Sequence, residues 1–115
     1  MRDPKERLRD VQDAIAAIDR YRDRGKAAFE QDELLQVWFL RHLQIIAEAA
    51  RALPENVWAL APEIPRHKIV GMRNVLVHGY FDIDTDIVWD AAARDLPALE
   101  PAIERLLGTL EERDG

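Results

Sequence analysis

The stretch "DELLQVWFLRHLQIIAEAARAL", residues 32 to 53, decides the fold, because apolar side chains occupy most sides of the helix that it predicts. The helix is expected to begin near Asp32 and to end at about Leu53, directly before Pro54. Its apolar residues are Leu34, Leu35, Val37, Trp38, Phe39, Leu40, Leu43, Ile45 and Ile46. Such a helix lies at the centre of a bundle, or it also contributes to an oligomer interface.

The N-terminal stretch predicts an amphipathic helix. Asp3 suits the N-cap, Pro4 the first helical position, and Glu6 the capping-box spacing. One apolar face follows, formed by Leu8, Val11, Ile15 and Ile18. Gly25 suits the end of this helix.

Between the central helix and the C-terminal third, "PENVWALAPEIP" (residues 54–65) predicts a proline-bounded connection with one helical turn. A further helix is expected over residues 66–78, with Gly79 placed to end it. Its apolar stripe consists of Ile69, Met72 and Leu76.

The C-terminal third begins with a loop, "FDIDTD" (residues 81–86), in which Thr85 suits the cap of a short helix that reaches about Arg94. A last helix is expected after Pro97, with Leu99, Ile103, Leu106 and Leu110 on one face. No strand pattern of useful length appears. The sequence therefore predicts a single all-α domain, residues 1–115, folded as an up-and-down bundle of four to five helices.

Composition and charge exclude several classes of protein. The chain has no cysteine, and its longest apolar run, "VWFL", is far shorter than the ~20 residues of a membrane span. The charged N-terminus does not read as a signal peptide, so a cytoplasmic protein without a membrane partner is expected. The net charge is −6, but residues 1–80 carry +1 and residues 81–115 carry −7. This balance argues against DNA or a broad nucleic-acid groove and leaves room for a small phosphate site.

Metal ligation is weakly supported. His42, Glu48 and His67 form no Glu-x-x-His or His-x-x-x-His pair. The "DIDTD" segment begins like a calcium loop, but Ile87 stands where that loop needs glycine and Ala93 where it needs glutamate. An Asp-x-Asp metal pair of a nucleotidyltransferase would need a preceding strand and Gly-Ser turn, which are missing. We expect an acidic turn that caps the next helix, and no metal or other cofactor.

Glu48 is a separate candidate, because it stands among alanines in the apolar central helix. A buried carboxylate is costly unless it is paired. Arg73, on a neighbouring helix, is a plausible partner. A structural ion pair and a functional role both remain open for Glu48.

The segment "RNVLVHGY", residues 73 to 80, places a permanent cation, a neutral-pH proton carrier and a phenol within eight residues. On an ideal helix Arg73 and Tyr80 lie about 20° apart, whereas His78 points about 140° from Arg73. The three converge only if Gly79 ends the helix, or if a two-fold dimer builds one cleft from two chains. In the alternative interpretation His78 caps the helix C-terminus, Tyr80 packs, and Arg73 pairs with Glu48.

The spacing Arg73, four residues, His78, one residue, Tyr80 resembles the R-x4-H-x-Y motif of HEPN-domain ribonuclease toxins. The surrounding "IVGMRNVLVHGYFDIDTDIVW" (69–89) is similar to their HepT branch, the toxin partners of minimal nucleotidyltransferase antitoxins. "IIAEAARALP" (45–54) and "DLPALEPAIERLL" (95–107) fit the same branch. One departure is Arg66, where an aromatic residue often follows the proline.

The resemblance implies an all-α homodimer with a composite, metal-independent ribonuclease site at the dimer cleft. Arg73 and His78 would be catalytic, with Asn74, Tyr80 and Glu48 in support. Tyr80 would also be the residue to which the antitoxin attaches AMP. The chemistry of the residues agrees, because RNA carries its own nucleophile, His78 can transfer protons at neutral pH, and Arg73 can hold phosphate through its planar fork.

A second hypothesis belongs to another class: a non-catalytic helical module that binds a nucleotide or phosphate for a partner enzyme. Both hypotheses need Arg73. They differ at His78, which the cleavage chemistry requires and which binding does not.

Overall fold

The computed structural model describes residues 3–78 and 84–114, and for residues 73–78 it describes the backbone alone. Every regular element in these ranges is helical, which confirms the predicted all-α bundle. The elements are α1 (Pro4–Arg22), α2 (Gly25–Gln31), α3 (Glu33–Ala52), α4 (Glu55–Trp58), α5 (Arg66–His78), α6 (Thr85–Asp90), a π-helical turn η1 (Ala91–Asp95) and α7 (Leu96–Asp114). In the described ranges, no helix is long and apolar enough to cross a membrane.

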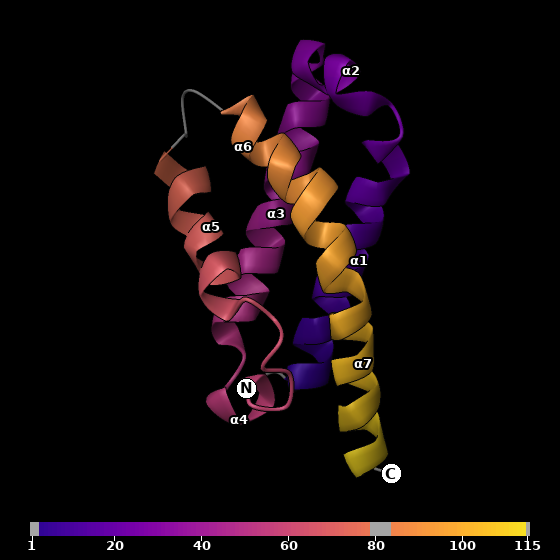
Figure 1. Cartoon of the computed structure of the whole chain (residues 1–115), viewed down its shortest axis with the longest axis vertical. Helices are drawn as coiled ribbons and strands as arrows, with labels where there is room; N and C mark the ends of the chain where they lie inside the picture. Colours follow the sequence, from indigo (N-terminus) through magenta and orange to yellow (C-terminus); the bar gives the residue numbers. More distant parts are fainter. Residues whose placement is uncertain (1–2, 79–83, 115) are drawn as a thin grey trace.

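The central position of α3 is the organising feature of the bundle (Figure 1). Helices α1 and α5 flank it and make its most extensive contacts, while α2, α6 and η1 contact it near one end of the molecule. The C-terminal end of α1, the helix α2, the start of α3 and the start of α6 gather at that end, and α5 rises toward it from α4 (Figure 1). The prediction that residues 32–53 form the central helix is confirmed.

The core is built where the sequence places its largest apolar side chains. Phe39, Leu43 and Ile46 of α3 are completely buried, as are Phe29 of α2 and Leu8 of α1. The ring centroids of Phe29 and Phe39 lie 5.0 Å apart, and Trp89 of α6 stacks on Phe39 at 6.2 Å. An aromatic cluster therefore joins α2, α3 and α6 at the end of the bundle where α5 also ends.

The cap of α1 is confirmed, because the Asp3 carboxylate accepts a hydrogen bond of 2.9 Å from the Lys5 backbone N–H. The helix ends at Arg22, and Gly25 follows with a φ of +86°, a conformation that glycine adopts without strain. Residues 25–31 then form α2, which the sequence did not predict. Only Phe29 of this short helix is buried, so no apolar periodicity signals it.

The predicted separation between the last two helices is wrong. α6, η1 and α7 follow one another without an intervening loop, from Thr85 to Asp114 (Figure 1). Pro97 lies in the first turn of α7, directly after the wider π-helical turn, and a missing backbone N–H is tolerated there. The cap of α6 is also a correction: Asp84, rather than Thr85, accepts hydrogen bonds from the backbone N–H groups of Asp86 (3.1 Å) and Ile87 (3.2 Å).

Candidate active site

Helix α5 carries most of the polar motif, and its bounds, Arg66–His78, are the predicted ones. Arg73, Asn74 and His78 belong to its C-terminal half, for which only the backbone is described. The predicted helix end at Gly79, the residue Tyr80 and the loop over residues 81–83 lie outside the described residues. The backbone thus places Arg73 and His78 on one helix, with His78 as its last residue.

The N-terminal half of α5 is held by contacts to the core and to α4. The Ile69 side chain is buried against the core, with 6% of its surface exposed. The guanidinium of Arg66 pairs with Glu55 of α4 and lies over the Trp58 ring, 5.5 Å from its centroid. Arg66 stands where the family often has an aromatic residue, and its guanidinium packs on the aromatic ring of Trp58.

A groove separates α5 from the helices that follow the motif. One cavity of about 290 Å³ lies between the start of α5 and the start of α7, and a second of about 570 Å³ lies farther along, against α6 and η1. Both are lined by Lys68, Met72, Arg94 and Asp95, and the Lys68 ammonium bonds to the Asp95 carboxylate at 2.9 Å. Met72 lines the second cavity and directly precedes Arg73 in the chain. The backbone of the motif therefore starts beside this cavity.

Glu48 is exposed, so the expectation of a buried carboxylate is wrong. Its neighbours Ala47, Ala49 and Ala50 take the buried positions of this turn of α3, with at most 3% of their surface exposed. Glu48 falls on the outward stripe of the helix, which also contains the exposed Val37 and Arg41. Exposure removes the desolvation cost on which the expected ion pair was argued, and the pairing of Glu48 with Arg73 stays a prediction, because the Arg73 side chain lies outside the described residues.

The described residues of the acidic segment after the motif, Asp84 and Asp86, stabilise the fold. Asp84 caps α6, as the predicted capping role of this turn requires, and Asp86 pairs with Lys26 of α2 at 3.1 Å. The hydrogen bond from Lys26 to Asp86 raises the pKa of Lys26 above its ordinary 10.5. Because the folded-state pKa is the higher one, this contact stabilises the fold below pH 10.5, and its contribution disappears as the pH rises through the folded value.

Metal ligation has no support among residues 3–72 and 84–114, where no three His, Asp or Glu side chains gather around a common point. His42 contacts Trp38, and His67 is exposed on the first turn of α5. Two features could not be predicted from the sequence: the groove with Lys68 and Arg94, and the contact of the Tyr21 ring of α1 with the Trp38 ring of α3, which also contacts His42. Only the tertiary packing brings the members of each together.

The helical bundle and its polar helix define a domain of the HEPN type, in which an Arg-x4-His spacing ends at the C-terminus of a flanking helix. The family described as "Ribonuclease HepT-like" matches residues 11–106, which include the whole motif. The chain belongs to this family of HEPN-type ribonucleases.

Relatives cover nearly the whole chain. The "Probable ribonuclease HepT" of Thermococcus cleftensis is 34% identical over 106 residues, which are 91% of this chain and 96% of that protein. A "Putative RNase" of Caldanaerobacter subterraneus is 31% identical over 93% of this chain and 96% of its own length. In Methanocaldococcus jannaschii, a "Gamma-glutamylcyclotransferase and putative RNase" is 30% identical over 98% of this chain and 50% of its own length. No solved structure matches the chain significantly.

Proposed function

We propose that the chain is a metal-independent endoribonuclease that acts as the toxin of a toxin–antitoxin pair. It would cleave RNA at a site built from Arg73 and His78, and a nucleotidyltransferase antitoxin would neutralise it by attaching AMP to Tyr80. The observation that carries the proposal is the position of the motif: it lies within the matched residues 11–106, and α5 ends at His78.

The chemistry divides between two side chains. His78 takes the proton from the RNA 2′-hydroxyl or gives one to the leaving 5′-oxygen, because an imidazole can do both near neutral pH. Arg73 binds the phosphate through its fork and stabilises the charge that develops at phosphorus. Asn74 and Glu48 have supporting roles, and Tyr80 orients the phosphate. A metal ion is not required for either proton transfer.

The active unit would be a homodimer, since one helix does not direct Arg73 and His78 to the same point. The two α5 helices, which carry the motif, are expected to approach each other across a two-fold axis and to build one cleft from two copies. Sedimentation should give a dimer at micromolar concentration, and a monomer would exclude the composite site.

Regulation at Tyr80 follows from the charge that AMP brings. The added phosphate would attract Arg73 and occupy the site meant for RNA phosphate. When the chain and a cognate nucleotidyltransferase are produced together in the cytoplasm, the peptide with Tyr80 should gain the mass of one or more AMP units. Tyr80→Phe should escape this gain. Modification of Tyr21 instead would contradict the assignment.

The decisive experiment is incubation of the purified chain with RNA in EDTA, followed by analysis of the product ends. We expect cleavage and a 2′,3′-cyclic phosphate or its hydrolysis product. If the folded protein binds RNA but leaves it intact, the non-catalytic phosphate-binding module is the better description.

A further inference from the structure

A row of planar side chains crosses the junction of α1 and α3. The rings of Tyr21 and Trp38 meet edge to face with centroids 5.8 Å apart, and the His42 ring follows 4.4 Å from Trp38. The Arg24 guanidinium lies over the other end of the row, 4.9 Å from the Tyr21 centroid. Four planar groups from two helices and the following turn are thus arranged one after another. We call Arg24, Tyr21, Trp38 and His42 the aromatic row.

Hydrogen bonds to backbone carbonyls hold Trp38 and His42 in place, and the rings of the row are only half-buried. The Trp38 indole N–H donates a 2.8 Å hydrogen bond to the Ala17 carbonyl, and Nδ1 of His42 lies 2.7 Å from the Trp38 carbonyl. Because a carbonyl only accepts, this contact is a hydrogen bond when Nδ1 carries a proton. The three rings are half-buried rather than covered.

Positive charge surrounds this row, although the chain is acidic. The segment "RYRDRGK", residues 20–26, has four cations and one acid in a protein with a net charge of −6. Two of these cations are engaged, since Arg22 pairs with Asp19 and Lys26 with Asp86. Arg20, Arg24 and Arg41 are exposed, and no ion pair holds any of them within the described ranges.

From this arrangement we infer that the aromatic row, with Arg20 and Arg41, is a binding site for single-stranded RNA that positions the substrate for cleavage. Exposed bases stack on aromatic rings and on arginine planes, and unpaired arginines bind the phosphates beside them. Double-stranded RNA presents no base faces for such stacking. The inference rests on the proposed function for its purpose, but the binding itself can be measured separately.

The place of the row in the fold suits this role. The C-terminal end of α1 and the first half of α3 lie at the end of the bundle toward which α5 runs (Figure 1). The row therefore lies at the same end of the molecule as the motif, on the α1 side of α3. A strand held there would extend beyond the scissile phosphate, where it adds binding without taking part in the chemistry.

The first test measures RNA binding in a His78→Ala background, so that the probe stays intact. The probes are labelled single-stranded oligoadenylate and the same strand in a duplex, followed by fluorescence anisotropy. Neutralising the three exposed cations of the site (Arg20→Gln, Arg24→Gln, Arg41→Gln) should weaken single-strand binding at least tenfold. The slope of log affinity against log salt should become shallower by about 0.7 for each phosphate that is no longer neutralised.

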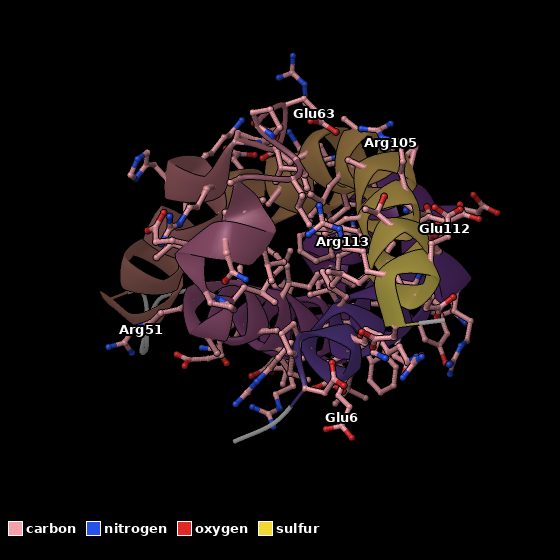
Figure 2. All side chains as sticks on the ribbon, turned by 90° about the horizontal axis from the view of Figure 1, so that it is seen from below. Glu6, Arg51, Glu63, Arg105, Glu112 and Arg113 are labelled. Atoms are coloured by element: carbon pink, nitrogen blue, oxygen red, sulfur yellow. The ribbon has the colours of Figure 1, made fainter. Side chains whose placement is uncertain are left out.

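A matched control removes the same charge elsewhere. Arg51, Arg105 and Arg113 are exposed and can be seen when the molecule is viewed from the opposite end (Figure 2). Changing all three to Gln gives the same net charge as the first variant. The control should change the affinity less than twofold. Equal weakening by both triple variants would show general electrostatics and would overturn the inference.

Ring substitutions test stacking separately from charge. Tyr21→Leu should weaken single-strand binding by about tenfold, the usual worth of one stacked base, whereas Tyr21→Phe should retain it. Trp38→Phe keeps a ring and should bind better than Trp38→Leu; circular dichroism checks that each variant is folded. Unchanged affinity in folded Tyr21→Leu, or equal binding of the duplex, would contradict the site.

The outcomes separate this inference from the proposed function. If the wild-type chain cleaves RNA and the row variants keep the wild-type KM, the function stands and the row is excluded. If no cleavage occurs but binding depends on the row, the binding site stands and the endoribonuclease is excluded. If the row variants convert a dimer to a monomer, the row is an interface between two copies, and the inference fails.

Discussion

Helices α3 and α5 lie against each other and differ in what holds them. α3 buries seven side chains and contacts α1, α2, α5, α6 and η1. Among the described residues, α5 has its extensive contact with α3, and Ile69 is its one buried side chain among residues 66–72. The described half of the helix that carries the candidate chemistry thus buries much less than the helix at the centre of the bundle.

This difference separates stability from activity. Free energy of folding comes mainly from apolar burial, which α3 shares with α1 and α7 and to which residues 66–72 of α5 contribute one buried side chain. We expect the motif residues of α5 to tolerate substitution with less effect on the core, because in the described ranges this helix packs extensively on α3 and on no other element to the same extent. We therefore expect substitutions of the buried side chains of α3 to act on unfolding, and substitutions of the motif residues of α5 to act on cleavage.

The largest expected effect is on the α5 side of the comparison. His78→Ala should lower the cleavage rate by about 10²–10⁴-fold, the usual contribution of one general acid or base. The melting temperature should change little. His67→Ala, an exposed histidine on the first turn of the same helix, is the matched control and should cleave like the wild type. If the two variants cleave equally, α5 does not carry the chemistry.

On the α3 side, Phe39→Ala should lower the free energy of unfolding by about 3–5 kcal/mol, because it removes a completely buried ring. The substitution would also remove the packing of this ring against Phe29 and Trp89. Val37→Ala, half-exposed on the same helix, should change the free energy of unfolding by less than about 0.5 kcal/mol. Urea unfolding monitored by circular dichroism measures both. Similar values for the two would show that α3 is not the central core helix.

Arg73→Ala should reduce kcat/KM by about 10²–10³-fold, since it removes the cation expected at the phosphate. Arg73→Lys should restore only part of the activity, because an ammonium lacks the bidentate fork. Unfolding curves should match the wild type. If Arg73→Ala instead lowers the free energy of unfolding and leaves kcat/KM nearly unchanged, Arg73 forms a structural ion pair.

The smallest effect is expected in the groove beside α5. Lys68→Gln or Asp95→Asn breaks an exposed ion pair and should cost about 0–1 kcal/mol of unfolding free energy. The double variant should cost no more than either single change. A cost of several kcal/mol would mean that α5 depends on this contact far more than the exposure of Lys68, 62%, suggests.

Much of the candidate site could be predicted from local sequence. The sequence predicts the helix over residues 66–78, because Pro65 precedes it and apolar residues recur at helical spacing. Arg73 and His78 are five positions apart within this helix, so the sequence alone places both on it. Glu48 could not be placed in this way, because the sequence shows that its neighbours are apolar but not which side of α3 faces solvent.

Two predictions of helix ends were wrong for a related reason. Asp84 and Thr85 both suit an N-cap, and the choice depends on which backbone N–H groups the turn presents. Pro97 normally marks a boundary, but the π-helical turn before it lets α6 continue into α7. Such a turn depends on packing against the rest of the bundle, which no local pattern reveals.

The sequence alone determined the helical class, the central helix and the polar motif, because all three depend on periodicity and short spacings along one chain. The tertiary structure decided which side chains from distant segments meet. Tyr21 and Trp38 are 17 positions apart, and Lys68 and Asp95 are 27 apart; each pair is in contact only because α1 packs on α3 and η1 lies beside α5. Such contacts form because the helices bury their apolar faces against one another. The residues beside those faces are brought together by this packing, and no local sequence pattern predicts which of them will meet.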